Sequence, residues 1–484
     1  MIQFDEHQSK LFTAITDTEY HICVQATAGA GKTTVILEAL NYVPKFKRTI
    51  FLSFSNAIVK ELKSRVPVGI KAATLHSHGF SLLIRAYGEL KLEENKYFKS
   101  ALFTFYNDKA TRTKENLRDC FRIQEICNFY RMTLCEHDEE KLMEVCEYYG
   151  LDWNVDLVMK ALELLKTAKE VYDEIDFTDM IYLPIVNPHI INGKYDYVFV
   201  DEAQDMNSCQ EAFVNLLLAD KGRRILIGDK FQSIYSFMGS KVDVFESFQK
   251  QPNTITLTFP TSYRCPKEVV KRAQRVCDTI ITHENAKDGL FVEASSIDDI
   301  REGDMVVSRI TRPLIELFFI LLDRGVKANI VGKEIEKGLI QFSELVQAYD
   351  RDIVLQNLTK QLKHTFDELT EIGFKKPKEH QKYIAMEEKC EVIRLILRKC
   401  STGMELVSKI KDIFREDKKS VKLMTIHKSK GLEAERVFLI YKYEGEKLLP
   451  FRAATKPWEL VQETNLEFVG VTRSKSELHF LEIA

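Results

Sequence analysis

The glycine-rich run at residues 26–34, Ala-Thr-Ala-Gly-Ala-Gly-Lys-Thr-Thr, constrains the fold of this chain more than any other segment. An apolar stretch at residues 21–25 precedes it, and residues 35–40 have the apolar spacing of a helix. Strand, glycine-rich turn and helix in this order are the setting of a phosphate-binding P-loop, which predicts an α/β core. Because the strict pattern has glycine at the position of Ala26, a chance Gly-Lys-Thr turn is the alternative interpretation.

The residue types of this run suit a nucleoside triphosphate. Glycines let the backbone turn its N–H groups toward phosphate oxygens, Lys32 supplies a positive charge for the outer phosphates, and the Thr33 hydroxyl can ligate Mg²⁺. We expect the nucleotide to contact Ala28, Gly29, Ala30, Gly31, Lys32, Thr33 and Thr34.

Length and composition are those of a soluble protein with several folding units. At 484 residues the chain exceeds one ordinary core, and 45% hydrophobic with 29% charged residues is typical of globular proteins. No apolar run approaches the ~18 residues of a membrane span and the N-terminus lacks a signal-peptide pattern, so we expect a cytoplasmic protein that binds no membrane. Ten cysteines without a Cys-x-x-Cys pair favour free thiols over a zinc ribbon. A net charge of −3 neither indicates nor excludes nucleic-acid binding.

Polar residues also follow three further predicted strands, in residues 49–56, 195–205 and 224–232. In an open parallel sheet the ligand lies beyond the carboxyl ends of the strands, so polar residues after successive strands converge there. The sequence therefore predicts an α/β fold with a parallel sheet and a nucleotide site at one edge of it.

A second α/β pattern follows the first, and a helical segment interrupts each. The first core is expected to take residues 1–80 and 173–265, around a helical insertion at 81–172. The second core is expected to take residues 266–333 and 421–484, around a helical insertion at 334–420. No Pro/Gly-rich linker separates the cores, so we expect them to pack across a cleft.

Catalytic groups for phosphoanhydride hydrolysis follow two of the predicted strands. Asp201 and Glu202 come directly after an apolar run; one carboxylate can hold Mg²⁺ and its neighbour can accept the proton of an attacking water. We assign Asp201 to the metal and Glu202 to the base, with a solvated acidic loop as the alternative. Gln232 is an amide able to contact the γ-phosphate, with Tyr235 and Phe237 close in sequence.

Two arginines stand in motif-like settings further along the chain, Arg264 in Thr-Ser-Tyr-Arg-Cys-Pro and Arg473 in Val-Gly-Val-Thr-Arg-Ser. Arginines that reach a nucleotide from a neighbouring domain stabilise the charge of phosphoryl transfer and couple hydrolysis to cleft closure. Each arginine taken alone could instead form a surface ion pair.

Together these segments resemble the motifs of the UvrD/Rep-like superfamily 1 DNA helicases. In chain order, the matching segments are residues 4–8, 26–34, 54–57, 74–77, 176–180, 201–205, 228–235, 263–264, 425–433 and 469–474. Alanine at the first P-loop position is usual in this family, so Ala26 supports the resemblance. The two insertions lie outside it.

The resemblance implies two RecA-like P-loop NTPase core domains with parallel sheets, each interrupted by a helical insertion, and ATP with Mg²⁺ as cofactors. It implies that Gln8 reads the adenine, Tyr263 stacks on it and Glu433 contacts the ribose. It makes Arg264 and Arg473 arginine fingers. The residues that it implies for the single-stranded DNA track are Phe54, Asn56, Thr74, His76, Tyr235, Phe237, Thr425 and His427.

The implied activity is ATP-dependent movement along single-stranded DNA with unwinding of duplexes. The sequence Gln-Ser-Ile-Tyr at residues 232–235 is similar to the 3′-to-5′ branch of the family. The expected partners are single-stranded DNA and its junctions with duplex, together with replication, repair or recombination proteins.

Two departures from the family pattern leave alternatives open. Phe237-Met238 stands where the family usually has Trp-Arg, and residues 462–465, Gln-Glu-Thr-Asn, replace an arginine-rich helix start. The first departure removes a cation between the ATP and DNA sites. It favours a translocase that displaces proteins without unwinding, and an ATP-gated binding switch is a further alternative.

Overall fold

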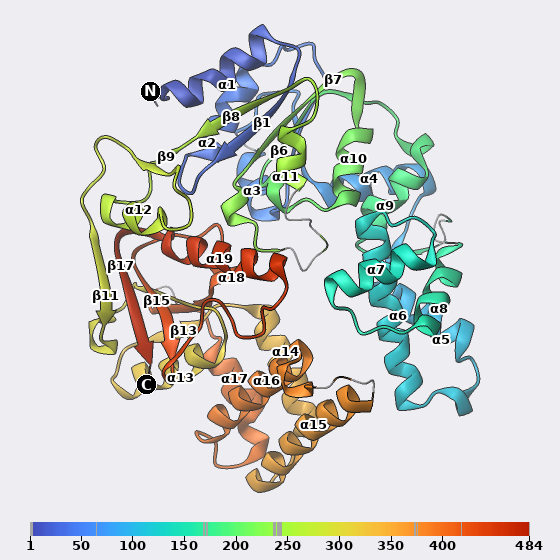
Figure 1. Ribbon diagram of the computed structural model, residues 1–484, viewed down its shortest axis with the longest axis vertical. Coiled ribbons are helices and arrows are strands. Elements are labelled where there is room, and N and C mark those ends of the chain that lie inside the picture. The colour runs from blue at the N-terminus through green and yellow to red at the C-terminus, as the bar shows by residue number, and fades with distance from the viewer. Residues whose placement is uncertain are drawn as a thin grey trace. The chain divides into compact units, whose positions relative to one another are not determined.

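Two compact units make up the chain in this computed structural model, Met1–Pro260 and Thr261–Ala484, here the first and the second unit (Figure 1). The structure describes residues 3–63, 65–167, 170, 173–235, 239, 244–371, 374, 376–417 and 419–483. Tyr263 and Arg264, which the sequence assigned to the end of the first core, belong by this division to the second unit.

The first unit is built on a six-stranded parallel sheet in the order β3-β2-β6-β7-β1-β8. The strands are β1 (His21–Ala26), β2 (Thr49–Ser53), β3 (Lys71–Thr74), β6 (Tyr195–Val200), β7 (Leu218–Gly228) and β8 (Thr254–Phe259). The inner strands are apolar and buried along most of their length; β2 is buried at every position. Such strands belong to a parallel sheet that helices cover on both faces. The predicted α/β class is confirmed.

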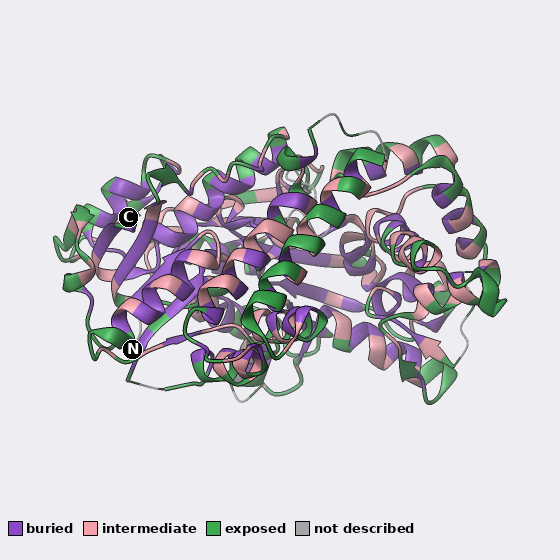
Figure 2. Cartoon of the chain, turned by 90° about the horizontal axis from the view of Figure 1, so that it is seen from below, coloured by how far each residue is buried: buried purple, intermediate pink, exposed green. Residues whose placement is uncertain are grey.

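Helices follow the strands in the alternation that a parallel sheet requires. They are α1 (Glu6–Asp17), α2 (Lys32–Ala39), α3 (Asn56–Leu62), α4 (Leu75–Tyr87), α9 (Asp179–Val186), α10 (Ser208–Leu216) and α11 (Val244–Gln249). In Figure 2 the strands are largely buried, whereas many helices expose one side and bury the other. This one-sided burial is the pattern of helices packed on a sheet.

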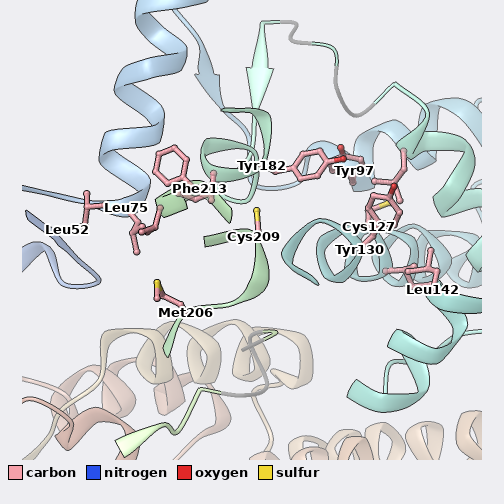
Figure 3. Close-up of a cluster of buried hydrophobic side chains, with 14 of the residues drawn as sticks. Leu52, Leu75, Tyr97, Cys127, Tyr130, Leu142, Tyr182, Met206, Cys209 and Phe213 are labelled. Atoms are coloured by element: carbon pink, nitrogen blue, oxygen red, sulfur yellow. The ribbon is translucent and has the colours of Figure 1, made fainter. Parts of the chain in front are cut away.

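A helical insertion leaves the first sheet after α4 and returns before α9. Its helices are α5 (Lys96–Phe105), α6 (Lys114–Thr133), α7 (Glu139–Tyr149) and α8 (Val155–Leu165). The short strands β4 (Lys91–Leu92) and β5 (Glu174–Ile175) pair where the chain enters and leaves it. One apolar cluster runs from the sheet residue Leu52 through Phe213 of α10 to Cys127 and Leu142 of the insertion (Figure 3). Core and insertion of the first unit are therefore packed together.

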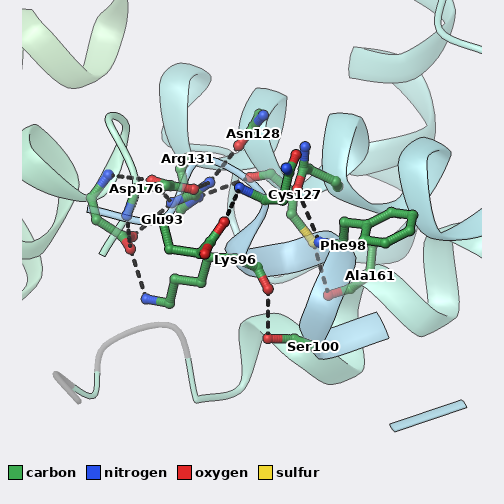
Figure 4. A network of polar contacts seen from close by, with 12 residues as sticks. Glu93, Lys96, Phe98, Ser100, Cys127, Asn128, Arg131, Ala161 and Asp176 are labelled. Carbon is green, nitrogen blue, oxygen red and sulfur yellow. Dashed lines mark hydrogen bonds and ion pairs between the residues drawn. The ribbon is translucent and has the colours of Figure 1, made fainter. Parts of the chain in front are cut away.

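A buried ionic group joins the insertion to the segment that re-enters the core (Figure 4). Arg131 of α6 has no exposed surface and donates to both carboxylate oxygens of Asp176, at 2.8 and 2.7 Å, and to Asp179 at 2.6 Å. Lys96 of α5 donates to the other Asp179 oxygen at 2.7 Å. Burial opposes ionisation of Asp176, but the Arg131 guanidinium outweighs it and holds the pKa of that carboxyl below its usual value.

The second unit contains a seven-stranded sheet in the order β11-β17-β15-β12-β14-β13, parallel except that β16 adds antiparallel to β15. The strands are β11 (Leu290–Ser295), β12 (Met305–Ser308), β13 (Ala328–Ile330), β14 (Val421–Thr425), β15 (Ala434–Tyr443), β16 (Glu446–Lys447) and β17 (Ser474–Ile483). Separately, β9 (Thr261–Ser262) pairs with β10 (Ile281–Thr282). The second unit thus repeats the parallel architecture of the first.

Helices of the second unit cover its sheet and form a second insertion. The helices next to the sheet are α12 (Lys267–Ala273), α13 (Arg312–Asp323), α18 (Ile426–Ser429) and α19 (Pro457–Val471). The insertion helices are α14 (Lys333–Val346), α15 (Arg351–Glu371), α16 (Gln381–Leu397) and α17 (Leu406–Ile413). Sheet and insertion share one apolar cluster, which includes Leu423 of β14 and Ile393 of α16.

Three strands that the sequence did not predict lie at sheet edges. β3 and β8 end the first sheet and β11 ends the second. The segment of β8, Thr-Ile-Thr-Leu-Thr-Phe, is only partly buried, and that of β11 has no fully buried position. An edge strand needs no continuous apolar run because part of it faces solvent, so its sequence carries a weak strand signal.

The ten cysteines are free thiols, and nine of them are buried. Burial raises the pKa of Cys127 to about 12, so this thiol stays protonated and packs as a small apolar group. Within the described ranges, no helix has both the length and the apolar content to cross a bilayer.

Arg131→Ala should destabilise the first unit by about 3–5 kcal/mol, because it leaves the buried Asp176 carboxylate without its cation and Asp179 with Lys96 alone. Urea unfolding followed by circular dichroism measures this as a lower midpoint. Lys141→Ala is the control, since it breaks only the exposed pair with Glu136 and should leave the midpoint within error. An unchanged midpoint in Arg131→Ala would contradict the role of the buried group.

Candidate functional site

The predicted catalytic residues of the first unit follow three neighbouring strands. In the order β6-β7-β1, Asp201 and Glu202 follow β6, Gln232 lies in the turn after β7, and the P-loop follows β1. Since all three strands are parallel, these residues lie together at the carboxyl edge of the sheet.

The P-loop has the backbone geometry for binding phosphate. Gly29 and Gly31 have φ of 75° and 74°. This left-handed conformation is strained in residues that carry a side chain and is easily adopted by glycine. Lys32 then begins α2, whose first N–H groups have no partner within the helix, so they and the helix dipole favour an anion. The Thr27 hydroxyl of the same loop is buried and has no hydrogen-bond partner among the described residues. A phosphate group fits this loop.

Gln8 is held against the P-loop. Its backbone N–H donates to Asp5 Oδ1 at 2.7 Å and its side chain accepts from Asp5 N, which caps α1. The remaining side-chain atom, Nε2, donates to the carbonyl of Ala30 at 3.1 Å. The predicted adenine-reading residue therefore also connects α1 to the loop that would hold the phosphates.

Glu202 faces the P-loop lysine. Glu202 Oε1 lies 3.6 Å from Lys32 Nζ, and both side chains are largely buried. The backbone of Glu202 is left-handed, with φ of 55°, which is uncommon for a residue other than glycine and is often found at functional sites. The predicted base and the predicted phosphate-binding lysine thus lie within reach of one another.

Asp201 meets the requirements of a Mg²⁺ ligand. It is 2% exposed at the end of β6, and its Oδ1 accepts the backbone N–H of Glu202 at 2.9 Å. A carboxylate at this edge and the Thr33 hydroxyl in the first turn of α2 are oxygen donors of the kind that Mg²⁺ prefers beside phosphates. The donor set fits the expected metal.

Gln232 lies in the short 3₁₀ turn Lys230–Gln232 after β7, 4% exposed. Its Nε2 donates to Asp229 Oδ2 at 2.6 Å, which holds the Gln232 amide against the buried carboxylate that follows β7. Sequence reasoning gave Asp229 no role, although Asp229 has no exposed surface and lies next to the predicted γ-phosphate contact.

The predicted nucleotide residues of the second unit gather around Glu433. Arg264 Nε donates to Glu433 Oε2 at 2.7 Å, and a second guanidinium nitrogen donates to the Thr472 carbonyl at 3.3 Å. Burial opposes ionisation of Glu433, but Arg264 holds the pKa of its carboxyl below the usual value. The ring of Tyr263 is 42% exposed and contacts His283 at 4.9 Å between centroids.

Arg473 follows α19 and is 1% exposed. Its Nε donates to the Val469 carbonyl at 2.8 Å and another nitrogen to the Leu432 carbonyl at 3.3 Å. These carbonyls hold the guanidinium beside the segment that carries Glu433.

Each unit has its own strand-to-helix junction where DNA contacts are predicted, and the two junctions are alike. Thr74 ends β3 and caps α4, accepting from Ser77 N at 3.1 Å; Thr425 ends β14 and caps α18, accepting from Lys428 N at 3.4 Å. A histidine occupies the second helical position in both, His76 and His427. Burial lowers the pKa of His76, and it lowers the pKa of His427 to about 3, so both rings are neutral at pH 7. They offer an aromatic face and hydrogen bonds rather than charge.

The other predicted DNA residues of the first unit differ in exposure. Phe54 follows β2 and packs partly against the apolar cluster, whereas Asn56 begins α3 and is exposed. Burial raises the pKa of Tyr235 to about 12. Phe237 and Met238 lie outside the described residues, so the predicted contact at Phe237 stays a prediction.

The model of the UvrD/REP helicase N-terminal domain matches residues 7–253. That span covers more than half of the chain and contains Gln8, the P-loop, Asp201, Glu202 and Gln232. The chain belongs to the UvrD/Rep helicase family.

Relatives of this UvrD/Rep family member include helicases from several bacteria. It is similar to the ATP-dependent DNA helicase Rep of Buchnera aphidicola, with 26% identity over 313 residues, 59% of this chain and 44% of that protein. It is similar to the ATP-dependent DNA helicase PcrA of Staphylococcus epidermidis, with 26% identity over 325 residues, 61% of this chain and 43% of that protein. The match therefore spans less than half the length of these relatives.

The neutral state of His427 in this UvrD/Rep family member predicts how its stability depends on pH. The unfolded chain protonates this histidine below about pH 6.5 and the folded chain only below about 3, so stability falls as pH drops through that interval. At pH 5 the difference amounts to about 2 kcal/mol. His427→Asn should therefore flatten the fall of melting temperature between pH 6.5 and 4, whereas the exposed His137→Asn should not. Equal slopes in both variants would contradict the assignment.

Proposed function

We propose that the chain is an ATP-dependent motor that moves 3′ to 5′ along single-stranded DNA and unwinds duplexes. The observation that carries the proposal is the carboxyl edge of the first sheet, where the P-loop, the Lys32–Glu202 pair at 3.6 Å and Gln232 lie together. The proposal is also supported by the names of two similar proteins, the ATP-dependent DNA helicases Rep and PcrA.

In the proposed hydrolysis, the P-loop N–H groups and Lys32 bind the β- and γ-phosphates, and Glu202 accepts the proton of the attacking water. Asp201 and Thr33 would hold Mg²⁺, which neutralises phosphate charge when bound. Gln232 contacts the γ-phosphate through its side-chain amide. The proposal uses the second unit as well: Arg264 and Arg473 stabilise the charge of the transition state, and Tyr263 and Glu433 hold the nucleoside.

DNA binding is proposed to use the strand-to-helix junctions of both units. Aromatic rings stack on bases without reading their sequence, which suits a motor that must pass over any strand. Phe54, Tyr235 and Phe237 would supply such rings, and the neutral His76 and His427 would stack or donate a hydrogen bond. Asn56, Thr74 and Thr425 would contact the sugar-phosphate backbone.

Lys32→Ala and Glu202→Gln should both lower DNA-stimulated ATP turnover by at least ~10³-fold, but for different reasons. Loss of Lys32 removes a phosphate contact and should weaken binding of a fluorescent ATP analogue. Loss of the Glu202 carboxylate removes the base and should leave that affinity within about 2-fold. Near-normal turnover in Glu202→Gln would show that the base was wrongly assigned.

Tailed duplexes test the motor and its direction. With a 3′ single-stranded tail the protein should unwind the duplex, and saturating single-stranded DNA should raise ATP turnover several-fold. Unwinding only from a 5′ tail would reverse the proposed polarity. Displacement of a tail-bound protein without strand separation would favour the translocase, and ATP turnover indifferent to DNA would favour the binding switch.

A further inference from the structure

Asp229 occupies the centre of the candidate site without contacting solvent. It follows β7, the strand between β6 and β1, and is 0% exposed. Burial raises the pKa of its carboxyl, while Lys32 and the surrounding hydrogen bonds act in the opposite direction. Two side-chain amides contact Asp229 from either side. One belongs to the buried Gln204, in the segment after β6, and the other to the partly buried Gln25 of β1.

The hydrogen bonds determine the orientation of the Gln204 amide. The Asp229 backbone N–H can only donate, and it donates to Gln204 Oε1 at 2.9 Å. The other end, Nε2, therefore faces Glu202 and donates to its Oε2 at 2.5 Å. Gln204 is 2% exposed, so little room is left for another arrangement.

The Glu202 carboxylate thus lies between one hydrogen-bond donor, the Gln204 amide, and one cation, Lys32. Its Oε2 accepts from Gln204, and its Oε1 faces Lys32 Nζ at 3.6 Å. Without the Gln204 donor, the carboxylate could turn both oxygens toward the lysine, because opposite charges attract strongly in a buried site. In such an ion pair, Glu202 would not be available as the base and Lys32 would not be available to bind phosphate.

Gln25 holds the other side of Asp229. Its Nε2 donates to Asp229 Oδ1 at 2.8 Å, and its Oε1 accepts the backbone N–H of Lys230 at 3.2 Å. Asp229 Oδ2 accepts from Gln232. The turn that carries the γ-phosphate contact is therefore tied to β1, the strand that leads into the P-loop.

Gly228 lets Gln204 come this close. A Cβ built on Gly228 would lie 3.0 Å from the backbone nitrogen of Gln204 and would overlap its Oε1. Any larger residue at this position would push the Gln204 amide away from Asp229 and Glu202.

We propose that Gln204 and Gln25 are positioning residues for the hydrolysis. Gln204 keeps the Glu202 carboxylate off Lys32 and directed at the attacking water. Gln25, through Asp229, keeps Gln232 at the γ-phosphate. The inference rests on the proposed function, because it assigns these amides to the same ATP site.

Gln204→Met keeps the volume of the side chain but removes its donor and acceptor. It should lower turnover by ~10- to 100-fold while the affinity for a fluorescent ATP analogue changes less than about 3-fold, since the P-loop is intact. Gln25→Leu should act in the same direction through Gln232. The matched control is Gln210→Met, which removes a buried amide that caps α10 and should leave turnover unchanged.

Two further measurements separate positioning from a merely structural effect. In a Glu202→Gln background, Gln204→Met should cause no further loss of turnover, because the base on which it acts is already gone. Gln204→Glu places a second carboxylate beside Glu202, so the acid limb of the pH–rate profile should move to higher pH.

If DNA failed to stimulate ATP turnover by the wild-type protein, the proposed function itself would be contradicted. With an active wild type, Gln204→Met turnover within about 2-fold of normal would overturn the inference. Equal losses of turnover in Gln204→Met and Gln210→Met would also overturn it. The same holds if Gln204→Met lowers turnover further in the Glu202→Gln background.

Discussion

The parallel direction of the strands is the constraint on which the candidate site depends. Because β6, β7 and β1 are neighbours and run the same way, the residues that follow them meet at one edge although the sequence separates them by up to about 200 positions. Asp229 lies at the end of the middle strand and can be contacted from both sides. A reversed or exchanged strand would remove either Gln204 or Gln25 from Asp229.

Buried charge is matched by a specific partner in both functional and structural parts of the first unit. Arg131 would be costly to bury alone, and it is neutralised by Asp176 and Asp179. Asp229 accepts hydrogen bonds from Gln25, Gln232 and the Phe231 backbone, with Lys32 nearby. The first group joins an insertion to its core, and the second joins neighbouring strand ends around the nucleotide site.

The motifs were readable in the sequence because each needs its own residue types in consecutive positions. The P-loop requires two left-handed glycines before a helix, and the inner strands require apolar runs, so both could be predicted. The edge strands β8 and β11 could not, since partial exposure removes the apolar run. β3 could not either, because its four residues, Lys-Ala-Ala-Thr, include a single β-branched side chain and no aromatic one. The role of Arg131 was also missed, because a lone arginine in a helix gives no sign of burial.

The sequence by itself determined the α/β class, the family resemblance and the residues expected at the nucleotide, since these depend on local residue patterns. Only the tertiary structure decided which side chains meet. Gln25 and Gln204 became candidates because strand order brings both to Asp229, and no spacing in the sequence encodes that contact. Contacts between strand ends depend on the order and direction of the strands, which long-range pairing alone establishes.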